Sequence, residues 1–147
     1  MQAIELLNSK GIMIDLSLYQ QILYNIFINA WKFNHMGGKI KLSVFVNSVM
    51  GERRKLKMTT EIEDNGEGMD KLQLKKLFKI FENIRKNEFK RSESESNASE
   101  RNVTSGCGLG LHLSYQLAKF LDGDIQVNSQ VQQGTSVKVI LLVDIGK

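Results

Sequence analysis

The residues best suited to chemistry lie in Gly106–Leu111, where three glycines at alternate positions stand immediately before a helical pattern of apolar residues. Glycine reaches backbone angles that other residues avoid and lets a ligand approach the main chain closely. A helix that begins here directs unpaired N–H groups and the positive end of its dipole toward an anion such as phosphate. Short glycine patterns also occur in ordinary flexible turns, so this stretch alone leaves both interpretations open.

A second candidate is a polar stripe on an otherwise apolar segment. Residues 18–33 have the periodicity of a helix with a broad apolar face. Asn25 and Asn29 lie one turn apart on another face, and Lys32 follows three residues later. Because asparagine is a middling to poor helix former, a pair in mid-helix suggests a gain that offsets its propensity cost. The stripe is either a solvated face or a ligand-facing one that binds metal and phosphate oxygens.

A third candidate is the acidic tip at residues 63–69, which follows a predicted strand and contains two glycines. A calcium loop is excluded because the spacing of oxygen ligands differs from that of an EF-hand and no helices flank the segment. Two interpretations remain: a plain surface turn, or an Asp64 carboxylate held at a strand end to bind a ligand.

The elements that position these groups alternate between helical and strand periodicity. Helices are predicted at residues 18–33 and 71–84 and from Leu111 onward, with Asp15 or Ser17 able to cap the first. Strands are predicted at residues 12–15, 39–49, 56–62, 125–129 and 136–143, with a charged hairpin turn at 51–55. Three helices and at least four strands, the last two in a hairpin, indicate an α/β two-layer sandwich (α+β) with helices packed on one face of a mixed sheet.

A long polar segment separates the second helix from the glycine stretch. Residues 85–105 are rich in Ser, Glu, Asn and Lys and contain almost no large apolar side chains, so we expect a loop. A long loop beside a glycine-rich site is often a lid. The middle part, residues 92–100, is nearly as well explained as an insertion without a role.

Composition narrows the class of protein. The chain has 147 residues, 41% hydrophobic and 24% charged, which suits one globular domain with a sizeable core. We expect no membrane span and no signal peptide, and the single cysteine suits a reducing compartment. These features predict a cytoplasmic domain, although its parent protein can be anchored in a membrane. A net charge of +4, with basic residues spread among acidic ones, gives no indication of nucleic-acid binding.

Four motifs in order resemble those of one family. Residues 25–33 resemble the N box, 64–69 the first glycine box, 78–82 the F box and 106–111 the second glycine box of sensor histidine kinases. The chain is therefore similar to their ATP-binding catalytic domain, within the gyrase, Hsp90, histidine kinase and MutL ATPase superfamily. Gly123–Ile125 and Gly134–Ser136 match the strand and turn that usually close this domain. The resemblance covers about residues 12–143 and implies that residues 1–147 are one domain with the Bergerat fold and a long polar ATP lid at 83–105.

The resemblance also implies ATP and Mg²⁺ as ligands and assigns roles to the motif residues. Asn29 is the implied Mg²⁺ ligand, while Asn25 and Lys32 contact the metal shell and the phosphates, so these three are the candidate catalytic residues. Asp64 is implied to accept a hydrogen bond from the adenine amino group. The other candidate nucleotide-binding residues line the purine, anchor the lid or close over the phosphates: Phe33, Gly66, Gly68, Met69, Phe78, Phe81, Gly106, Cys107, Gly108, Leu109, Gly110, Leu111 and Thr135.

Three departures from the family pattern bear on function. Members that hydrolyse ATP carry a glutamate four residues before the metal-binding asparagine, where this chain has Asn25, an amide that cannot act as a base. Cys107 stands where Thr or Ser is common, which is better explained as a harmless substitution than as a redox role. Neither His35 nor His112 resembles the phosphoacceptor motif of a histidine kinase.

The resemblance and its departures lead to one main hypothesis. The chain is predicted to be a protein-histidine kinase catalytic domain that binds Mg-ATP and donates its γ-phosphate to a histidine on a separate dimerisation domain. The implied partners are that domain and, downstream in a two-component phosphorelay, a response regulator receiver. An alternative is a regulatory or pseudokinase module that binds nucleotide, or nothing, and acts through protein contact. A Rossmann dehydrogenase fits poorly because the glycine stretch follows a polar loop instead of a strand.

Overall fold

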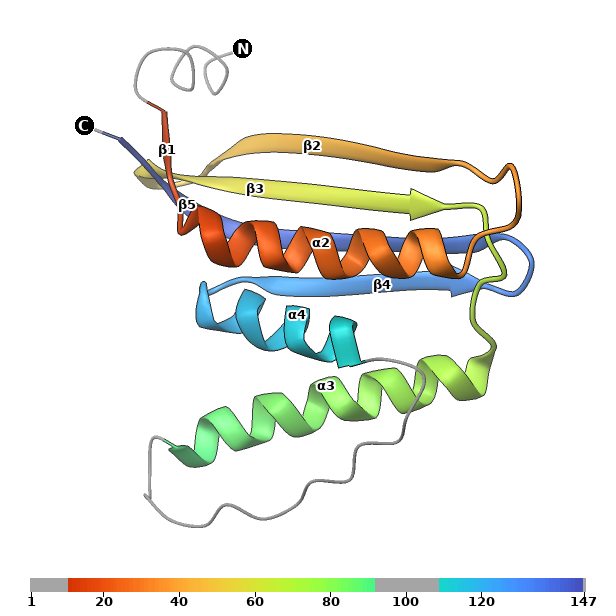
Figure 1. Cartoon of the computed structure of the whole chain (residues 1–147). Helices are drawn as coiled ribbons and strands as arrows, with labels where there is room; N and C mark the ends of the chain where they lie inside the picture. Colours follow the sequence, from red (N-terminus) through yellow and green to blue (C-terminus); the bar gives the residue numbers. More distant parts are fainter. Residues whose placement is uncertain (1–10, 92–108, 147) are drawn as a thin grey trace.

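The computed structural model describes residues 11–91 and 109–146, which form three helices and five strands (Figure 1). The strands are β1 (Ile12–Met13), β2 (Ile40–Val49), β3 (Glu52–Asp64), β4 (Asp124–Gln130) and β5 (Gly134–Ile145). The helices are α2 (Leu16–Lys32), α3 (Lys71–Arg91) and α4 (Leu109–Phe120). No described helix is both long and apolar enough to cross a membrane.

The sheet is built around β5, which pairs with β3 along one side and with β4 and β1 along the other. β2 pairs with the far side of β3 and forms an edge. All four pairings are antiparallel, so within the described residues the sheet is antiparallel, where the sequence had indicated a mixed one. The hairpin expected from the last two strands is confirmed as β4–β5.

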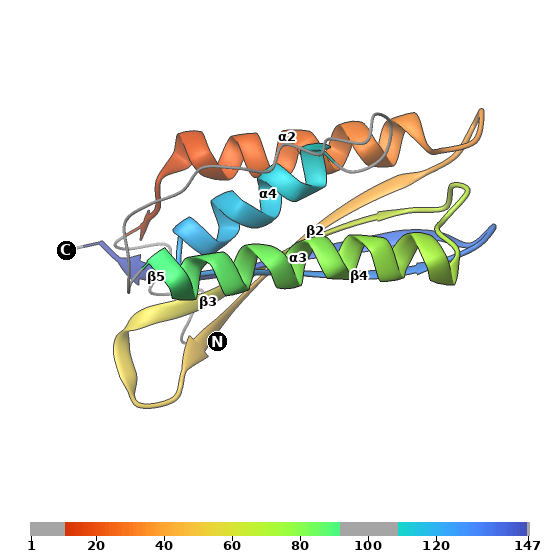
Figure 2. The same ribbon diagram turned by 90° about the horizontal axis from the view of Figure 1, so that it is seen from below.

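The two layers follow from the alternation of side chains along β3 and β5. Every second residue of β3, from Leu56 to Ile62, is buried beneath the helices, as expected for a sheet covered on one face. α2 and α4 pack against each other over this face, and α3 lies beside α4 (Figures 1 and 2). The predicted two-layer α/β sandwich is therefore confirmed.

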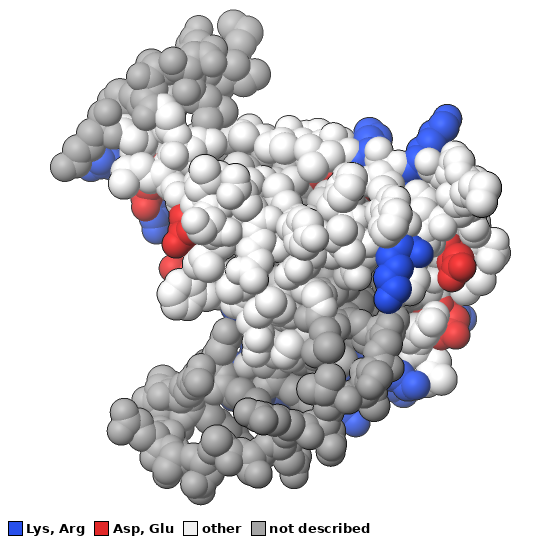
Figure 3. Space-filling model, in the orientation of Figure 1, with Lys and Arg blue, Asp and Glu red and all other residues white. Residues whose placement is uncertain are grey.

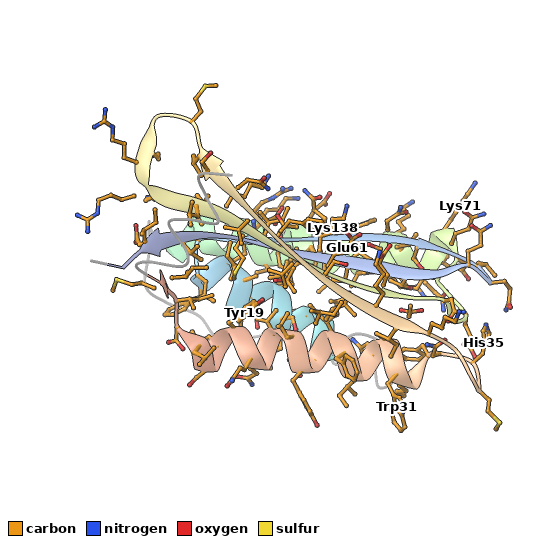
Figure 4. The ribbon with its side chains drawn as sticks, turned by 90° about the horizontal axis from the view of Figure 1, so that it is seen from above. Tyr19, Trp31, His35, Glu61, Lys71 and Lys138 are labelled. Atoms are coloured by element: carbon orange, nitrogen blue, oxygen red, sulfur yellow. The ribbon has the colours of Figure 1, made fainter. Side chains whose placement is uncertain are left out.

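Polar contacts hold α2 in place, and others lie on the face of the sheet that no helix covers. Asp15 caps α2 by accepting from Leu18 N at 3.1 Å, and the Tyr19 hydroxyl meets Thr60 Oγ1 of β3 at 2.6 Å. On the other side of the sheet Lys138 Nζ lies 3.5 Å from Glu61 Oε1 (Figure 4). The uncovered face thus carries this ion pair, and the apolar side chains of Phe45 and Leu142 are exposed on it as well.

Two predicted boundaries were wrong. The turn between β2 and β3 lies at residues 50–51, and residues 52–55, expected in the turn, begin β3. Helix α3 continues to Arg91, so residues 83–91, assigned to the lid or loop, are helical. This stretch contains neither glycine nor proline and has several good helix formers, which explains the continuation. Residues 92–105 of the predicted lid lie outside the described residues.

The outer surface of α2 carries aromatic side chains. Tyr24 and Trp31 are 66% and 69% exposed, and Trp31 points away from the sheet (Figure 4). The face of the molecule seen in Figure 3 is largely uncharged across its centre, with Lys, Arg, Asp and Glu gathered toward its rim. The stripe that bears Asn25 and Asn29 is on a different flank of the helix.

Candidate functional site

The two asparagines of α2 meet the first turn of α4. A Cβ built on Gly110 would lie 3.6 Å from Asn25 Cβ and 3.8 Å from Asn29 Nδ2, which is ordinary contact distance. Two segments more than eighty positions apart in the sequence are therefore neighbours, and the beginning of α4 faces the polar stripe. Its N-terminal dipole adds a positive potential on this side of the asparagines.

Asn25 carries an unsatisfied polar group. Within the described part of the chain its Nδ2 is buried and has no hydrogen-bond partner. A buried amide nitrogen without an acceptor costs about 1–3 kcal/mol, so such groups are rare unless a ligand completes them. The missing partner of an N–H donor is an acceptor oxygen, and a phosphate oxygen meets that requirement.

Ser114 of α4 holds this junction together. Its Oγ lies 2.9 Å from Gly110 O and 3.3 Å from Ile22 O of α2, and the residue is fully buried. The hydroxyl has one proton to donate between the two carbonyls. It therefore fixes the first turn of α4 against the middle of α2, the place where the asparagines stand.

Asp64 forms the second part of the site, at the end of β3. Its Oδ1 accepts hydrogen bonds from Gly66 N at 2.9 Å and from Thr135 N at 3.3 Å. Burial raises the pKa of the carboxyl above its usual value, while these two bonds and the nearby His35 act in the opposite direction. Both bonds end on one oxygen, so the second oxygen can accept from a ligand.

The glycines beside Asp64 are required by the protein's own packing. A Cβ on Gly66 would collide with the main-chain carbonyl of Phe33, and a Cβ on Gly68 with that of Gln130. Gly68 also has a φ of +66°, in the left-handed region that favours glycine. These positions bring the loop after β3 against both the end of α2 and the β4–β5 hairpin.

Phe33, Met69 and Lys32 surround this loop. Phe33 caps the C-terminus of α2 and its carbonyl accepts from Glu67 N at 3.0 Å, while Met69 packs against the core. Lys32 Nζ lies 5.1 Å from the centre of the Phe33 ring, a cation–π contact. The cation is thus placed over Phe33, one turn beyond Asn29.

The aromatic residues of the F box connect α3 to α4. Phe81 is buried and stacks on Tyr115 with ring centres 4.0 Å apart, and Phe78 meets the edge of Phe81 at 6.3 Å. Leu111 is also part of the hydrophobic core. Phe81 and Leu111 therefore position α4 by packing within the protein.

For four residues of the second glycine box the structure gives no side-chain contacts. Gly106, Cys107 and Gly108 lie outside the described residues, and Leu109 is placed only as the first residue of α4. The sequence interpretation missed Ser114 and Tyr115, which carry the α2–α4 and α3–α4 contacts. It also missed Ser129 of β4, whose hydroxyl accepts from Met69 N. The predicted hairpin was the one signal in the sequence that could have indicated Ser129, because it pairs this residue with the candidate site residue Thr135.

Comparison with known proteins gives consistent matches. The sequence model of a family described as histidine kinase-, DNA gyrase B-, and HSP90-like ATPase matches residues 14–145. The chain is 29% identical over 123 residues to the peroxide stress-activated histidine kinase mak2 of Schizosaccharomyces pombe. It is 32% identical over 123 residues to the autoinducer 2 sensor kinase/phosphatase LuxQ of Vibrio parahaemolyticus and 29% identical over 127 residues to the sensor histidine kinase YvrG of Bacillus subtilis.

The matches span most of this chain but only a small part of each relative. The matches cover 83%, 84% and 86% of this chain but only 5%, 13% and 18% of mak2, LuxQ and YvrG. Among solved structures, full-length ShkA in complex with AMPPNP is similar in fold, with a TM-score of 0.57 and 19% identity over 94% of this chain and 24% of ShkA.

Proposed function

The chain belongs to the family of histidine kinase-, DNA gyrase B- and HSP90-like ATPases, and from that membership we propose that it binds Mg-ATP as a two-component sensor kinase domain. In this proposal it transfers the γ-phosphoryl group to a histidine on a separate dimerisation domain. The observation that carries the proposal is the buried, unpartnered Asn25 amide beside Gly110 and Asn29. A second anchor, Asp64, stands ready to accept from the base.

The donor set fits a magnesium ion that arrives with the nucleotide. Mg²⁺ prefers oxygen ligands, keeps several waters and needs only one or two protein groups when phosphates supply the rest. The Asn29 carboxamide offers one such oxygen, and no cluster of three or more His, Cys, Asp or Glu side chains occurs among the described residues. When bound, the ion would neutralise negative charge on the phosphates of the nucleotide. Asn25 would donate from its unpartnered Nδ2 to a phosphate oxygen, with the start of α4 alongside.

The absence of a base at position 25 favours transfer to imidazole over hydrolysis. Water must lose a proton as it attacks, and a carboxylate in the site would take that proton. A neutral imidazole nitrogen already presents a lone pair, so it forms the P–N bond as the P–O bond to ADP breaks without a base at Asn25. The chain's own contribution is then to bind, orient and shield the triphosphate.

The partners in this proposal are protein domains. The phosphoacceptor histidine belongs to a dimerisation domain, and the phosphoryl group then passes to a response regulator receiver. LuxQ and YvrG are named as sensor kinases, and the matched region is a small part of each. This relation supports the view that the domain works together with others, and the proposal places it inside the cell, where ATP is available.

Two measurements test the proposal in sequence. Calorimetric titration with a non-hydrolysable ATP analogue, with and without Mg²⁺, should give binding that is at least about tenfold tighter with the metal. Addition of a histidine-kinase dimerisation domain with γ-labelled ATP should then label its histidine. Metal-dependent binding without transfer to any such acceptor would favour the regulatory module. Lack of binding would contradict the proposal itself.

Nucleotide affinity is expected to fall at mildly acidic pH because of Asp64. Burial raises the pKa of this carboxyl in the folded protein, so it is protonated at a higher pH than an ordinary aspartate. The protonated form loses acceptor strength toward the adenine amino group, and binding weakens as pH falls through that raised pKa. Titrations of the parent and of Asp64→Asn from pH 7 to about pH 4 check this, since ionisation of the nucleotide affects both proteins equally. A parent profile parallel to that of the variant would contradict the assignment.

The pH dependence of folding stability that Asp64 contributes in the ligand-free protein is opposite to its effect on nucleotide affinity. Because its pKa is higher folded than unfolded, proton binding favours the folded state. This contribution is fully present below the unfolded pKa and is lost as pH rises through the folded one. Acidification should therefore weaken the nucleotide complex while the Asp64 contribution to the fold of the free protein increases.

A further inference from the structure

The tip of the β4–β5 hairpin is joined to the loop after β3 by a serine hydroxyl. Ser129 Oγ lies 2.8 Å from Met69 N, 3.1 Å from Gly134 O and 2.8 Å from Thr135 Oγ1. Ser129 and Thr135 are direct partners across the hairpin, and sixty positions separate Ser129 from Met69. The hydroxyl therefore connects a strand to a loop that is remote in sequence.

The roles of donor and acceptor at Ser129 follow from its single proton. The main-chain N–H of Met69 can only donate, so Ser129 Oγ must accept from it. The serine proton then goes either to the Gly134 carbonyl or to Thr135 Oγ1. In both arrangements Ser129 is tied to residues 134–135, and the N–H of Thr135 donates to Asp64 Oδ1 at 3.3 Å. A continuous chain of hydrogen bonds thus runs from Met69 through the hairpin tip to the Asp64 carboxylate.

Other contacts bring the same two segments together through main-chain atoms. Gln132 N donates to Glu67 O at 2.7 Å, and Gly68 approaches the carbonyl of Gln130 so closely that a Cβ would collide with it. Main-chain atoms make these contacts, so a conservative side-chain substitution would leave them in place. The Ser129 contact does involve a side chain, and it reaches the loop at Met69, at the opposite end from Asp64.

We propose that Ser129 is a positioning residue for recognition of the nucleotide base. It holds the loop of residues 64–69 against the hairpin tip, so that the Asp64 carboxylate and Met69 keep a fixed separation. A fixed separation matters because a hydrogen-bonding site discriminates between bases only when its acceptor is held where the ligand's donor must lie. The proposal rests on the proposed function and extends it to a residue that supports the preference for adenine over guanine by positioning Asp64.

The chain offers a matched control in the same hairpin. Ser136 Oγ donates to Glu61 Oε1 at 2.6 Å on the uncovered face of the sheet, away from the loop. Ser136→Ala and Ser129→Ala each remove one hydroxyl from neighbouring positions of one hairpin. Each variant loses one hydroxyl of the hairpin, while contact with the loop is lost only in Ser129→Ala.

The test compares the parent, Ser129→Ala, Ser136→Ala and Ser129→Thr by calorimetric titration with non-hydrolysable ATP and GTP analogues, together with thermal unfolding. Both alanine variants should unfold at reduced temperatures, and the unfolding curves measure how much stability each has lost. Only Ser129→Ala should weaken ATP-analogue binding, by roughly five- to tenfold for one hydrogen bond, and reduce the preference for ATP over GTP. Ser129→Thr, which keeps the hydroxyl, should restore both quantities. If Ser129→Ala does not fold, Ser129→Cys replaces it, since a thiol of similar volume is a weak acceptor.

The outcomes separate this proposal from the one on which it rests. Failure of the parent to bind either analogue overturns the proposed function and this inference with it. Strong binding by the parent, with Ser129→Ala and Ser136→Ala equal in affinity and base preference, overturns only the inference about Ser129. A loss of affinity in Ser129→Ala that is equal for ATP and GTP analogues also contradicts it, because a positioning residue for the base must change the preference.

Discussion

Replacement of Asn29 by alanine is expected to weaken Mg-dependent ATP binding by at least about 100-fold while the fold remains intact. Loss of a group that only orients a metal ligand typically lowers metal affinity 10- to 100-fold, so loss of Asn29, the proposed ligand, should reach at least the upper end. The side chain stands beside Gly110 at the beginning of α4, next to that of Asn25. The buried Nδ2 of Asn25 lacks an acceptor, which suits a phosphate oxygen and leaves Asn29 as the proposed ligand of the metal ion.

The fold should tolerate the Asn29 substitution for a physical reason. Asn29 is partly exposed, and its contribution to the end of α2 is made by its main-chain carbonyl, which accepts from Phe33 N at 3.0 Å. Alanine keeps that carbonyl and is a better helix former by roughly 0.5 kcal/mol. The thermal midpoint should therefore stay level or rise slightly.

The measurement is titration with the ATP analogue at saturating Mg²⁺ and in excess chelator. Gln20→Ala is the control, because Gln20 is an exposed amide on α2 that lies on a different flank of the helix. The control should bind like the parent. Metal-dependent affinity in Asn29→Ala within about twofold of the parent would show that the metal site lies elsewhere.

The elements that the sequence predicted best are those whose own periodicity is strong. The apolar face of α2, the alternation in β2 and the final hairpin are local patterns, and each element formed within a few residues of its predicted bounds. The end of α3 was missed because polarity was interpreted as a loop. A polar stretch of good helix formers continues a helix when nothing in it ends one, and residues 85–91 contain no glycine or proline.

The parts of the site that sequence could not reveal depend on contacts between distant segments. Gly110 meets Asn25 across 85 positions, and Ser129 meets Met69 across 60, so neither follows from the pattern around one residue. The resemblance of the motifs indicated which residues belong to one site, but the packing explains some of them differently. Phe81 stacks on Tyr115 in the core, and Gly66 is required by the close approach of the Phe33 carbonyl.

The second large effect is expected at Asp64, where replacement by asparagine should weaken adenine nucleotide binding by roughly 10- to 100-fold. Asparagine keeps one acceptor oxygen, which can still receive the bonds from Gly66 N and Thr135 N. Its other atom becomes an NH₂ group, a donor that in the proposed complex would face the amino group of adenine, also a donor. A favourable charge-assisted hydrogen bond is exchanged for two unpaired donors, a change of about 1.5–3 kcal/mol.

The same substitution separates recognition from folding, because burial makes the carboxylate costly in the free protein. Burial raises the pKa of Asp64, so a neutral amide of the same shape should leave the thermal midpoint unchanged or higher at pH 7. Reduced affinity in a variant at least as stable as the parent therefore has to come from the lost acceptor. Calorimetric titration with ATP and GTP analogues, with thermal unfolding of the same samples, measures both quantities. Parent-like affinity for the ATP analogue in Asp64→Asn would remove Asp64 from the base site, and a large fall in the thermal midpoint would show that the carboxylate serves the fold instead.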